Sequence, residues 1–261
     1  MGPALAPLRS EPGRAAILSD VDGTLAPIAP RPEQASVPEA ARAALRDLAG
    51  RYALVGCVSG RRAAEARALV AVEELLYVGN HGLERLEPGG DEPVFDSALA
   101  GREELASELV ASLDHGRLEA VGIRVEDKGP IQALHWRGAL SLAAAELEAR
   151  EAAALAQARG LHPHWGRKVL ELRPLADVDK GTVIERVLDG RSLSAALYAG
   201  DDTTDLDGFE GLRRLEGAGT IERAVCVGVA SEEGPPAIVE RADVVVTGTD
   251  GLIALLERLA A

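Results

Sequence analysis

Short apolar runs alternate with segments of helical spacing in the first third of the chain. The runs 15–19, 52–58 and 75–78 predict buried strands, while 37–49 and 61–70 repeat apolar positions three or four residues apart, as helices do. Ser36 is the expected cap of the first helix, with Pro38 in its first turn. Strand and helix in alternation indicate a parallel sheet with helices on its faces.

A different pattern occupies the middle of the chain. Residues 87–93 consist only of Pro, Gly and acidic residues and form a turn-rich break. After it the sequence predicts a helix at 103–113, strands at 121–126 and 131–137, a helix at 140–159 and a strand at 168–173. The two strands on either side of the turn 127–130 alternate with a period of two, which is typical of a hairpin. This order predicts a small α+β unit with an antiparallel sheet.

The alternating pattern then returns. Asp179 is placed to cap a helix that starts near Lys180, and further strands are predicted at 195–199, 225–229 and 244–247, followed by a helix at 251–259. The predicted fold class is therefore α/β, with a Rossmann-like parallel-sheet core and an inserted α+β domain. The expected boundaries are 1–97 and 176–261 for the core and 98–175 for the insertion.

Composition narrows the function classes. The 261 residues carry a net charge of −14, which argues against a general nucleic-acid or anionic-membrane surface. No apolar run approaches the ~20 residues of a membrane span. Residues 1–12 lack the basic and apolar regions of a secretory signal, so a cytoplasmic location is expected. Cys57 and Cys226 lie far apart in apolar runs and are predicted to be buried thiols.

Polar side chains follow several predicted strands. Asp20 and Asp22 follow the first, Ser59 follows the second, Lys180 starts a helix, and Asp201 follows a later strand. In an open parallel sheet, ligands bind beyond the carboxyl ends of the strands. If the sheet forms as predicted, these side chains converge on one crevice.

Phosphoryl transfer suits this set. A dianionic phosphate monoester repels a carboxylate nucleophile, and a divalent cation removes that repulsion; Mg²⁺ prefers such oxygen ligands. Asp20 is the candidate nucleophile. Asp22, two residues later and therefore on the same side of the chain, is the candidate acid and base. Ser59 and Lys180 are candidates to hold the phosphoryl oxygens.

Plainer explanations exist for single members of the set. An Asp pair at a turn often only caps it, and most lysines lie on solvated faces. A calcium loop needs a third oxygen ligand before its glycine, and Gly23 follows Asp22 directly. The occurrence of all the groups in order favours the shared crevice.

Four motifs resemble the haloacid dehalogenase-like phosphohydrolases, namely 20–24, Ser59, Lys180 with Gly181, and 200–205. The resemblance implies an aspartyl-phosphate on Asp20. It also implies metal ligation by the Asp20 side chain, the Asp22 main-chain carbonyl and Asp201, with Asp202 and Asp205 supporting the metal from the second shell. The insertion between Ser59 and Lys180 is similar to the type 2 (C2B) cap of that superfamily.

Longer motifs resemble the trehalose-6-phosphate phosphatase family, namely 20–28, 59–62, 79–84, 125–129, 134–137 and 166–174. The similarity extends from about residue 17 to 259. It implies sugar binding by Glu126, Lys128 and Glu171. The other residues that it suggests for substrate binding are Gly23, Arg61, Asn80, His81 and Lys168.

Spacing alone leaves the sugar site open. Glu126 and Lys128 fall on one side of a hairpin tip, and Glu171 and Arg173 share a strand face. These groups suit sugar hydroxyls, but a solvated surface with ion pairs would show the same spacing. His115 and His135 are predicted to be structural.

The expected function is Mg²⁺-dependent hydrolysis of trehalose 6-phosphate to trehalose and phosphate. Two alternatives remain: a phosphatase for another sugar phosphate, such as that of sucrose, glucosylglycerol or mannosylglycerate, and a regulator that binds sugar phosphate without catalysis. A zinc site at His162 and His164 lacks a third ligand nearby. The expected partner is a small sugar phosphate, with no nucleic acid or membrane, and the chain is expected to be a monomer.

Overall fold

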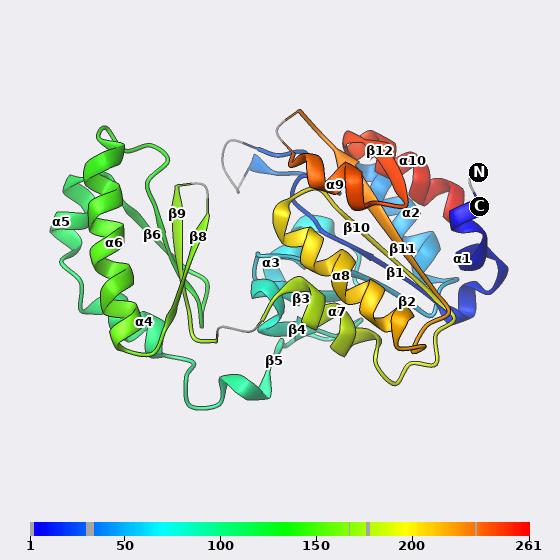
Figure 1. Cartoon of the computed structure of the whole chain (residues 1–261), viewed down its shortest axis with the longest axis horizontal. Helices are drawn as coiled ribbons and strands as arrows, with labels where there is room; N and C mark the ends of the chain where they lie inside the picture. The colour runs from blue at the N-terminus through cyan, green and yellow to red at the C-terminus, as the bar shows by residue number, and fades with distance from the viewer. Residues whose placement is uncertain (1–2, 30–33, 167, 176–177, 233) are drawn as a thin grey trace. The chain divides into compact units, whose positions relative to one another are not determined.

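The computed structural model describes residues 3–29, 34–166, 168–175, 178–232 and 234–261. It divides into two compact units, a core formed by Met1–Val94 with Val178–Ala261, and a cap formed by Phe95–Asp177 (Figure 1). These limits lie near the predicted domain boundaries, which stay predictions. Residue 176, at one of those boundaries, lies outside the described residues.

The core contains an eight-stranded sheet with the order β12-β11-β10-β1-β2-β3-β4-β5. The strands are β1 (Ala15–Ser19), β2 (Leu54–Val58), β3 (Leu76–Gly79), β4 (Glu84–Leu86), β5 (Val94–Phe95), β10 (Ala195–Gly200), β11 (Arg223–Ala230) and β12 (Val244–Thr247). The strands from β12 to β3 are parallel. β1 lies between β10 and β2, with Ala15 opposite Ala195 and Ala16 opposite Leu54. Its carboxyl end therefore lies near the middle of the sheet edge.

The predicted parallel-sheet core is confirmed, and the sheet also has an antiparallel side that the sequence did not indicate. β3 and β4 are antiparallel, with Tyr77 opposite Leu86. β4 has three residues and β5 has two, so neither contains enough alternating positions to be predicted from sequence.

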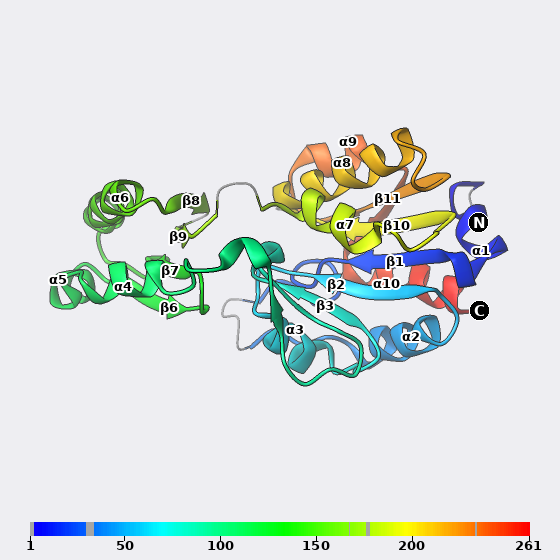
Figure 2. The same ribbon diagram turned by 90° about the horizontal axis from the view of Figure 1, so that it is seen from below.

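Helices cover both faces of the core sheet, as Figure 2 shows. One face packs against α1 (Ala6–Ser10), α2 (Glu39–Ala49), α3 (Ala63–Val70) and α10 (Gly248–Ala260), and the other against α7 (Lys180–Leu188), α8 (Thr203–Gly217) and α9 (Pro236–Arg241). Both faces are buried, which explains why the strands read as continuous apolar runs. Within the described ranges, no helix has the length and apolar content that a bilayer span requires.

The helix starts test two predicted caps. Ser36 does not cap α2, because the helix begins at Glu39 after Pro38, and the extended Pro38 has no side-chain donor or acceptor to cap it. Asp179 does cap α7: its carboxylate accepts from the backbone N–H of Thr182, and the Thr182 hydroxyl lies 3.2 Å from the Asp179 backbone nitrogen. This capping box fixes the start of the helix at Lys180.

The cap is an antiparallel sheet of order β6-β7-β9-β8 packed on helices. Its elements are α4 (Leu105–Ala111), α5 (His115–Ala120), β6 (Arg124–Asp127), β7 (Gln132–His135), α6 (Leu142–Ala158), β8 (His162–Gly166) and β9 (Val169–Arg173). Short 3₁₀ helices occur in both units. η1 (Pro3–Leu5), η2 (Pro12–Arg14) and η4 (Asn80–Gly82) belong to the core, and η5 (Ser97–Leu99) belongs to the cap. The predicted order lacked α5, which is short and contains Gly116, and β8, which contains few apolar residues.

The two faces of the cap sheet differ. Leu134, Leu170 and Leu172 are buried against α4 and the alanine-rich side of α6. The opposite face carries the residues that alternate with them. There the strand register places Glu126 opposite Ala133, Ala133 opposite Glu171, and Glu171 opposite His164. Two acidic side chains therefore lie in one row across the sheet.

Candidate active site

Asp20 and Lys180 form a buried ion pair at the carboxyl end of β1. Asp20 directly follows the strand, and its backbone N–H donates to the carbonyl of Ala199 on the neighbouring β10. Lys180, the first residue of α7, places Nζ 3.0 Å from Asp20 Oδ1 and 2.6 Å from Asp205 Oδ1. The sequence-predicted nucleophile and phosphate-binding lysine thus meet in the structure.

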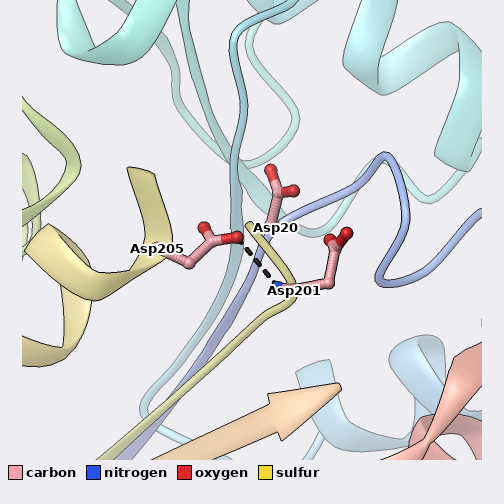
Figure 3. A group of neighbouring side chains, drawn as sticks. All are labelled: Asp20, Asp201 and Asp205. Atoms are coloured by element: carbon pink, nitrogen blue, oxygen red, sulfur yellow. Dashed lines mark hydrogen bonds between the residues drawn. The ribbon is translucent and has the colours of Figure 1, made fainter. Parts of the chain in front are cut away.

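Asp201 comes to the same place from the end of β10 (Figure 3). The Thr24 hydroxyl donates to Asp201 Oδ1 at 2.7 Å. Gly23 has a φ of +88°, and a Cβ at this position would overlap the Asp201 carboxylate. Gly23 is therefore required both for the turn after Asp22 and for the approach of Asp201.

Asp205, in the first turn of α8, is surrounded by donors. Its Oδ1 accepts from Lys180 Nζ and from the Tyr198 hydroxyl, both at 2.6 Å. Its Oδ2 accepts from the backbone N–H groups of Asp201 and Asp202, both at 2.9 Å, the first of which is drawn in Figure 3. The two bonds to Oδ2 hold the backbone of Asp201 and Asp202, and all four match a supporting position of Asp205 better than direct metal ligation.

The charges of this cluster do not balance. Asp20, Asp201 and Asp205 offer carboxylate oxygens that all lie within 4.8 Å of one another, and Lys180 is the cation bonded to two of them. Burial, with Asp205 and Asp201 nearby, raises the pKa of Asp20 well above its usual range. Burial also raises the pKa of Asp201 to about 6. An excess of buried negative charge favours a bound cation, and hard carboxylate oxygens fit Mg²⁺.

Lys180 is held in its charged form. Burial alone would lower its pKa, but the adjacent Asp20 and Asp205 raise it above the usual range. The ammonium group is 4% exposed and stays a cation at neutral pH. It can therefore offset the charge of a phosphoryl group next to Asp20.

Asp22 has a separate cation. Arg61 donates from Nε to Asp22 Oδ2 at 2.6 Å and from Nη2 to Oδ1 at 2.7 Å. The backbone N–H of Arg61 donates to Ser59 Oγ at 3.2 Å. The Asp22 side chain is 40% exposed and Ser59 is buried. Arg61 therefore connects a residue on the solvent side of the site with a buried one.

Asn80 and His81 form part of the loop that supports Ser59 and Arg61. The N–H of Asn80 donates to the Arg61 carbonyl at 2.7 Å, and that of His81 donates to the Ser59 carbonyl at 3.1 Å. Both have positive φ, 50° and 58°, and the His81 ring packs so closely on Gly60 that a Cβ there would clash. Asp202 stands apart, since its carboxylate caps α8.

The sugar-binding candidates lie in the cap. Lys128 Nζ is 3.0 Å from Glu171 Oε1, while Glu126 lies in the same cross-strand row as Glu171. Lys168 is exposed at the turn before β9, with a φ of +59°. Arg167, which belongs to the same predicted motif, lies outside the described residues. Three of the four described candidates in the cap therefore lie together: Lys128 contacts Glu171, and Glu126 shares the cross-strand row of Glu171.

Sequence reasoning missed the contact of His135 with Glu126, and it placed Arg173 on the strand face of Glu171 without assigning it to the sugar site. His135 Nε2 lies 2.6 Å from Glu126 Oε2, and this hydrogen bond lowers the pKa of Glu126. Arg173 donates to Glu171 Oε2 from Nε at 3.0 Å and from Nη2 at 2.6 Å. The alternation of β7 and β9 places His135 and Arg173 on the acidic face, so the period of two was the available signal.

Comparison with known proteins agrees with these features. The sequence pattern of the trehalose-phosphatase family matches residues 18–235. The chain belongs to this family. The match spans every core candidate, from Asp20 to Asp205, and the whole cap.

Individual relatives show the same similarity. A trehalose-phosphate phosphatase of Mycolicibacterium paratuberculosis is 38% identical over 208 residues, covering 76% of this chain and 51% of the relative. A Mycobacterium tuberculosis protein described as an uncharacterized glycosyl hydrolase is 36% identical over 217 residues, covering 80% of this chain and 16% of the relative. The chain therefore spans about half or less of the length of these relatives.

The fold has solved counterparts. The C-terminal domain of a Candida albicans trehalose-6-phosphate phosphatase superposes with a TM-score of 0.74 at 20% identity, covering 96% of this chain and 93% of that one. At this identity the likeness supports the fold alone. The likeness extends over both units, so the Candida albicans domain has the same core and cap as this chain.

Proposed function

We propose that this protein hydrolyses trehalose 6-phosphate to trehalose and phosphate. The observation that carries the proposal is the contact of Asp20 with Lys180 beside Asp201, in a chain of the trehalose-phosphatase family. A carboxylate, a cation and a metal-binding oxygen in one buried crevice are the components of phosphoryl transfer.

Each core residue has a defined task in the proposal. Asp20 attacks phosphorus, the bond to the sugar oxygen breaks, and Asp22 protonates that oxygen as trehalose leaves. Asp22 then takes a proton from the water that cleaves the aspartyl-phosphate. Lys180 and Ser59 hold the phosphoryl oxygens. Asp20, the Asp22 carbonyl and Asp201 would hold Mg²⁺, which would neutralise charge at the phosphoryl group, and Asp205 and Asp202 would support these ligands.

Arg61 would position Asp22. Its guanidinium holds both oxygens of Asp22 at 2.6 and 2.7 Å, which orients the acid and base before substrate arrives. Gly23, Asn80 and His81 shape the surrounding loops. All three would line the substrate site.

The cap residues supply the sugar specificity in the proposal. Glu126, Lys128 and Glu171 present carboxylates and an ammonium group suited to sugar hydroxyls, and Lys168 adds a cation at the start of β9. The antiparallel sheet between the two core segments is the proposed type 2 (C2B) cap. The monomeric state and the cytoplasmic location stay predictions.

One experiment tests the proposal. Phosphate release is measured from trehalose 6-phosphate, sucrose 6-phosphate, glucosylglycerol phosphate and mannosylglycerate phosphate, with Mg²⁺ and with a chelator. We expect the highest kcat/KM for trehalose 6-phosphate and loss of release with chelator. Faster release from another sugar phosphate would contradict the substrate, and binding without release from any of them would indicate a regulator.

A further inference from the structure

Two cap residues outside the predicted set contact the candidate sugar-binding carboxylates. His135 on β7 is a diagonal cross-strand neighbour of Glu126 on β6, since Ala133 is the residue opposite Glu126. Arg173 is two residues beyond Glu171 on β9 and on the same face. We infer that His135 and Arg173 are positioning residues that hold Glu126 and Glu171 for the sugar, an inference that rests on the proposed function.

The contacts to Glu171 take up both of its oxygens. Lys128 reaches Oε1 at 3.0 Å, and Arg173 reaches Oε2 through two nitrogens. The side chains of Lys128, Glu171 and Arg173 are only 14%, 9% and 12% exposed. A guanidinium that donates two hydrogen bonds to one oxygen restricts the rotamer of the glutamate side chain. A single contact from a flexible side chain restricts it less.

Glu126 is held differently. Its contact with His135 at 2.6 Å uses Oε2, and among the described residues Oε1 has no hydrogen-bond partner. Both side chains are 26% exposed. His135 therefore fixes one oxygen of Glu126 and leaves the other for a sugar hydroxyl.

Fixed carboxylates favour binding of a polyol. A glutamate that is free to rotate loses side-chain entropy when it accepts a hydroxyl, and that loss weakens binding. A glutamate already held by His135 or Arg173 has lost most of that freedom before the sugar arrives. His135 and Arg173 belong to the cap and bond to cap carboxylates, so we expect hydrolysis of a small ester that has no sugar to be independent of them.

The test is a pair of double-mutant cycles, His135→Ala with Glu126→Ala and Arg173→Met with Glu171→Ala. KM and kcat are measured for trehalose 6-phosphate and for p-nitrophenyl phosphate. We expect each positioning variant to raise KM for trehalose 6-phosphate about tenfold, with kcat and the small ester unchanged, because a charge-assisted hydrogen bond is lost. In the Glu126→Ala or Glu171→Ala background, the second substitution should add nothing.

Conservative variants separate positioning from folding. His135→Gln keeps an N–H near the position of Nε2, and Arg173→Lys keeps one cationic donor, so both should recover part of the lost affinity. His115→Ala is the matched control, an exposed histidine of the same unit on α5. Unfolding of each variant is followed by circular dichroism, so a loss that comes from a misfolded cap is identified by its melting curve.

The outcomes distinguish this inference from the proposed function. An unchanged KM in folded His135→Ala and Arg173→Met, or full additivity with Glu126→Ala and Glu171→Ala, would overturn the positioning role while trehalose 6-phosphate remains a substrate. Absence of hydrolysis of trehalose 6-phosphate by the wild-type protein would overturn both. A tenfold KM effect confined to the sugar phosphate would support both.

Discussion

The core and the cap each place acidic residues beside cations, but negative charge is in excess in the core cluster and balanced in the cap cluster. In the core, the carboxylates of Asp20, Asp201 and Asp205 surround the single ammonium group of Lys180. In the cap, Glu171 contacts both Lys128 and Arg173, and Glu126 contacts His135. An unbalanced buried cluster favours a bound divalent cation, whereas a balanced one suits an uncharged polyol. In the proposed function, this difference places the reaction in the core and sugar recognition in the cap.

The largest effect is expected from Asp20→Asn. The amide is a poor nucleophile of the same size, so turnover of trehalose 6-phosphate and of p-nitrophenyl phosphate should both fall at least about 10⁴-fold. Phosphate release from purified protein is the measurement. Appreciable residual turnover in a clean preparation would remove Asp20 from the nucleophile position.

Lysine substitutions compare the charge balance of the two units directly. Lys180→Met leaves Asp20 and Asp205 buried without their ammonium group, and should cost ~3–5 kcal/mol of unfolding free energy. Lys128→Met leaves Glu171 with Arg173 and should cost only about 1 kcal/mol. Urea denaturation measures both. Equal costs would mean that the two units do not differ as described.

Specificity should respond only to the cap. Glu126→Ala or Lys128→Ala should raise KM for trehalose 6-phosphate about tenfold by removing a charge-assisted hydrogen bond. The KM for p-nitrophenyl phosphate should stay constant, because that ester has no sugar. If both substrates respond equally, these residues do not recognise the sugar.

The smallest effect concerns pH and Mg²⁺. Because the pKa of Asp201 is about 6, a proton competes with the cation on this carboxylate below that pH. The rise in melting temperature on adding Mg²⁺ should therefore be larger at pH 7.5 than at pH 5.5. The sign follows from the raised pKa: without metal, the folded protein binds an extra proton between the unfolded pKa and about 6, so its stability falls as pH rises through that window.

This pH prediction has a control in the protein itself. In Asp201→Asn the titrating carboxylate is absent, so the Mg²⁺-induced shift should be small at both pH values. A shift that is equal at pH 5.5 and 7.5 in the wild-type protein would show that Asp201 does not ligate the ion.

Much of the core site could be predicted because parallel strands bring their carboxyl ends to one edge. Asp20 and Ser59 each follow a buried run, and the Asp179 cap marked the start of the helix with Lys180. The end of a strand or the start of a helix was sufficient to predict each of these positions. Helix α8 was missed because its first turn, around Asp205, contains so many polar residues that it resembles a loop.

Contacts between distant strands were beyond the reach of the pattern. Tyr198 donates to Asp205 from inside the buried apolar strand β10, and nothing in that run marks it as a polar contact of a site. The sequence predicts a structural role for His135, whereas in the structure it contacts Glu126 on another strand. Pairing that depends on strand register requires the structure, since a shift of one residue reverses the face of every side chain.

The position of β1 has a consequence for how the protein is made. Ala15 pairs with Ala195, so the strand that ends at Asp20 receives its β10 neighbour only after the cap has been synthesised. At ribosomal rates this interval is roughly 10–40 s. Until then one edge of β1 lacks its strand, and Asp20 has no Lys180 beside it. We expect the nascent chain to need protection during this interval, and the catalytic crevice to be among the last parts of the core to form.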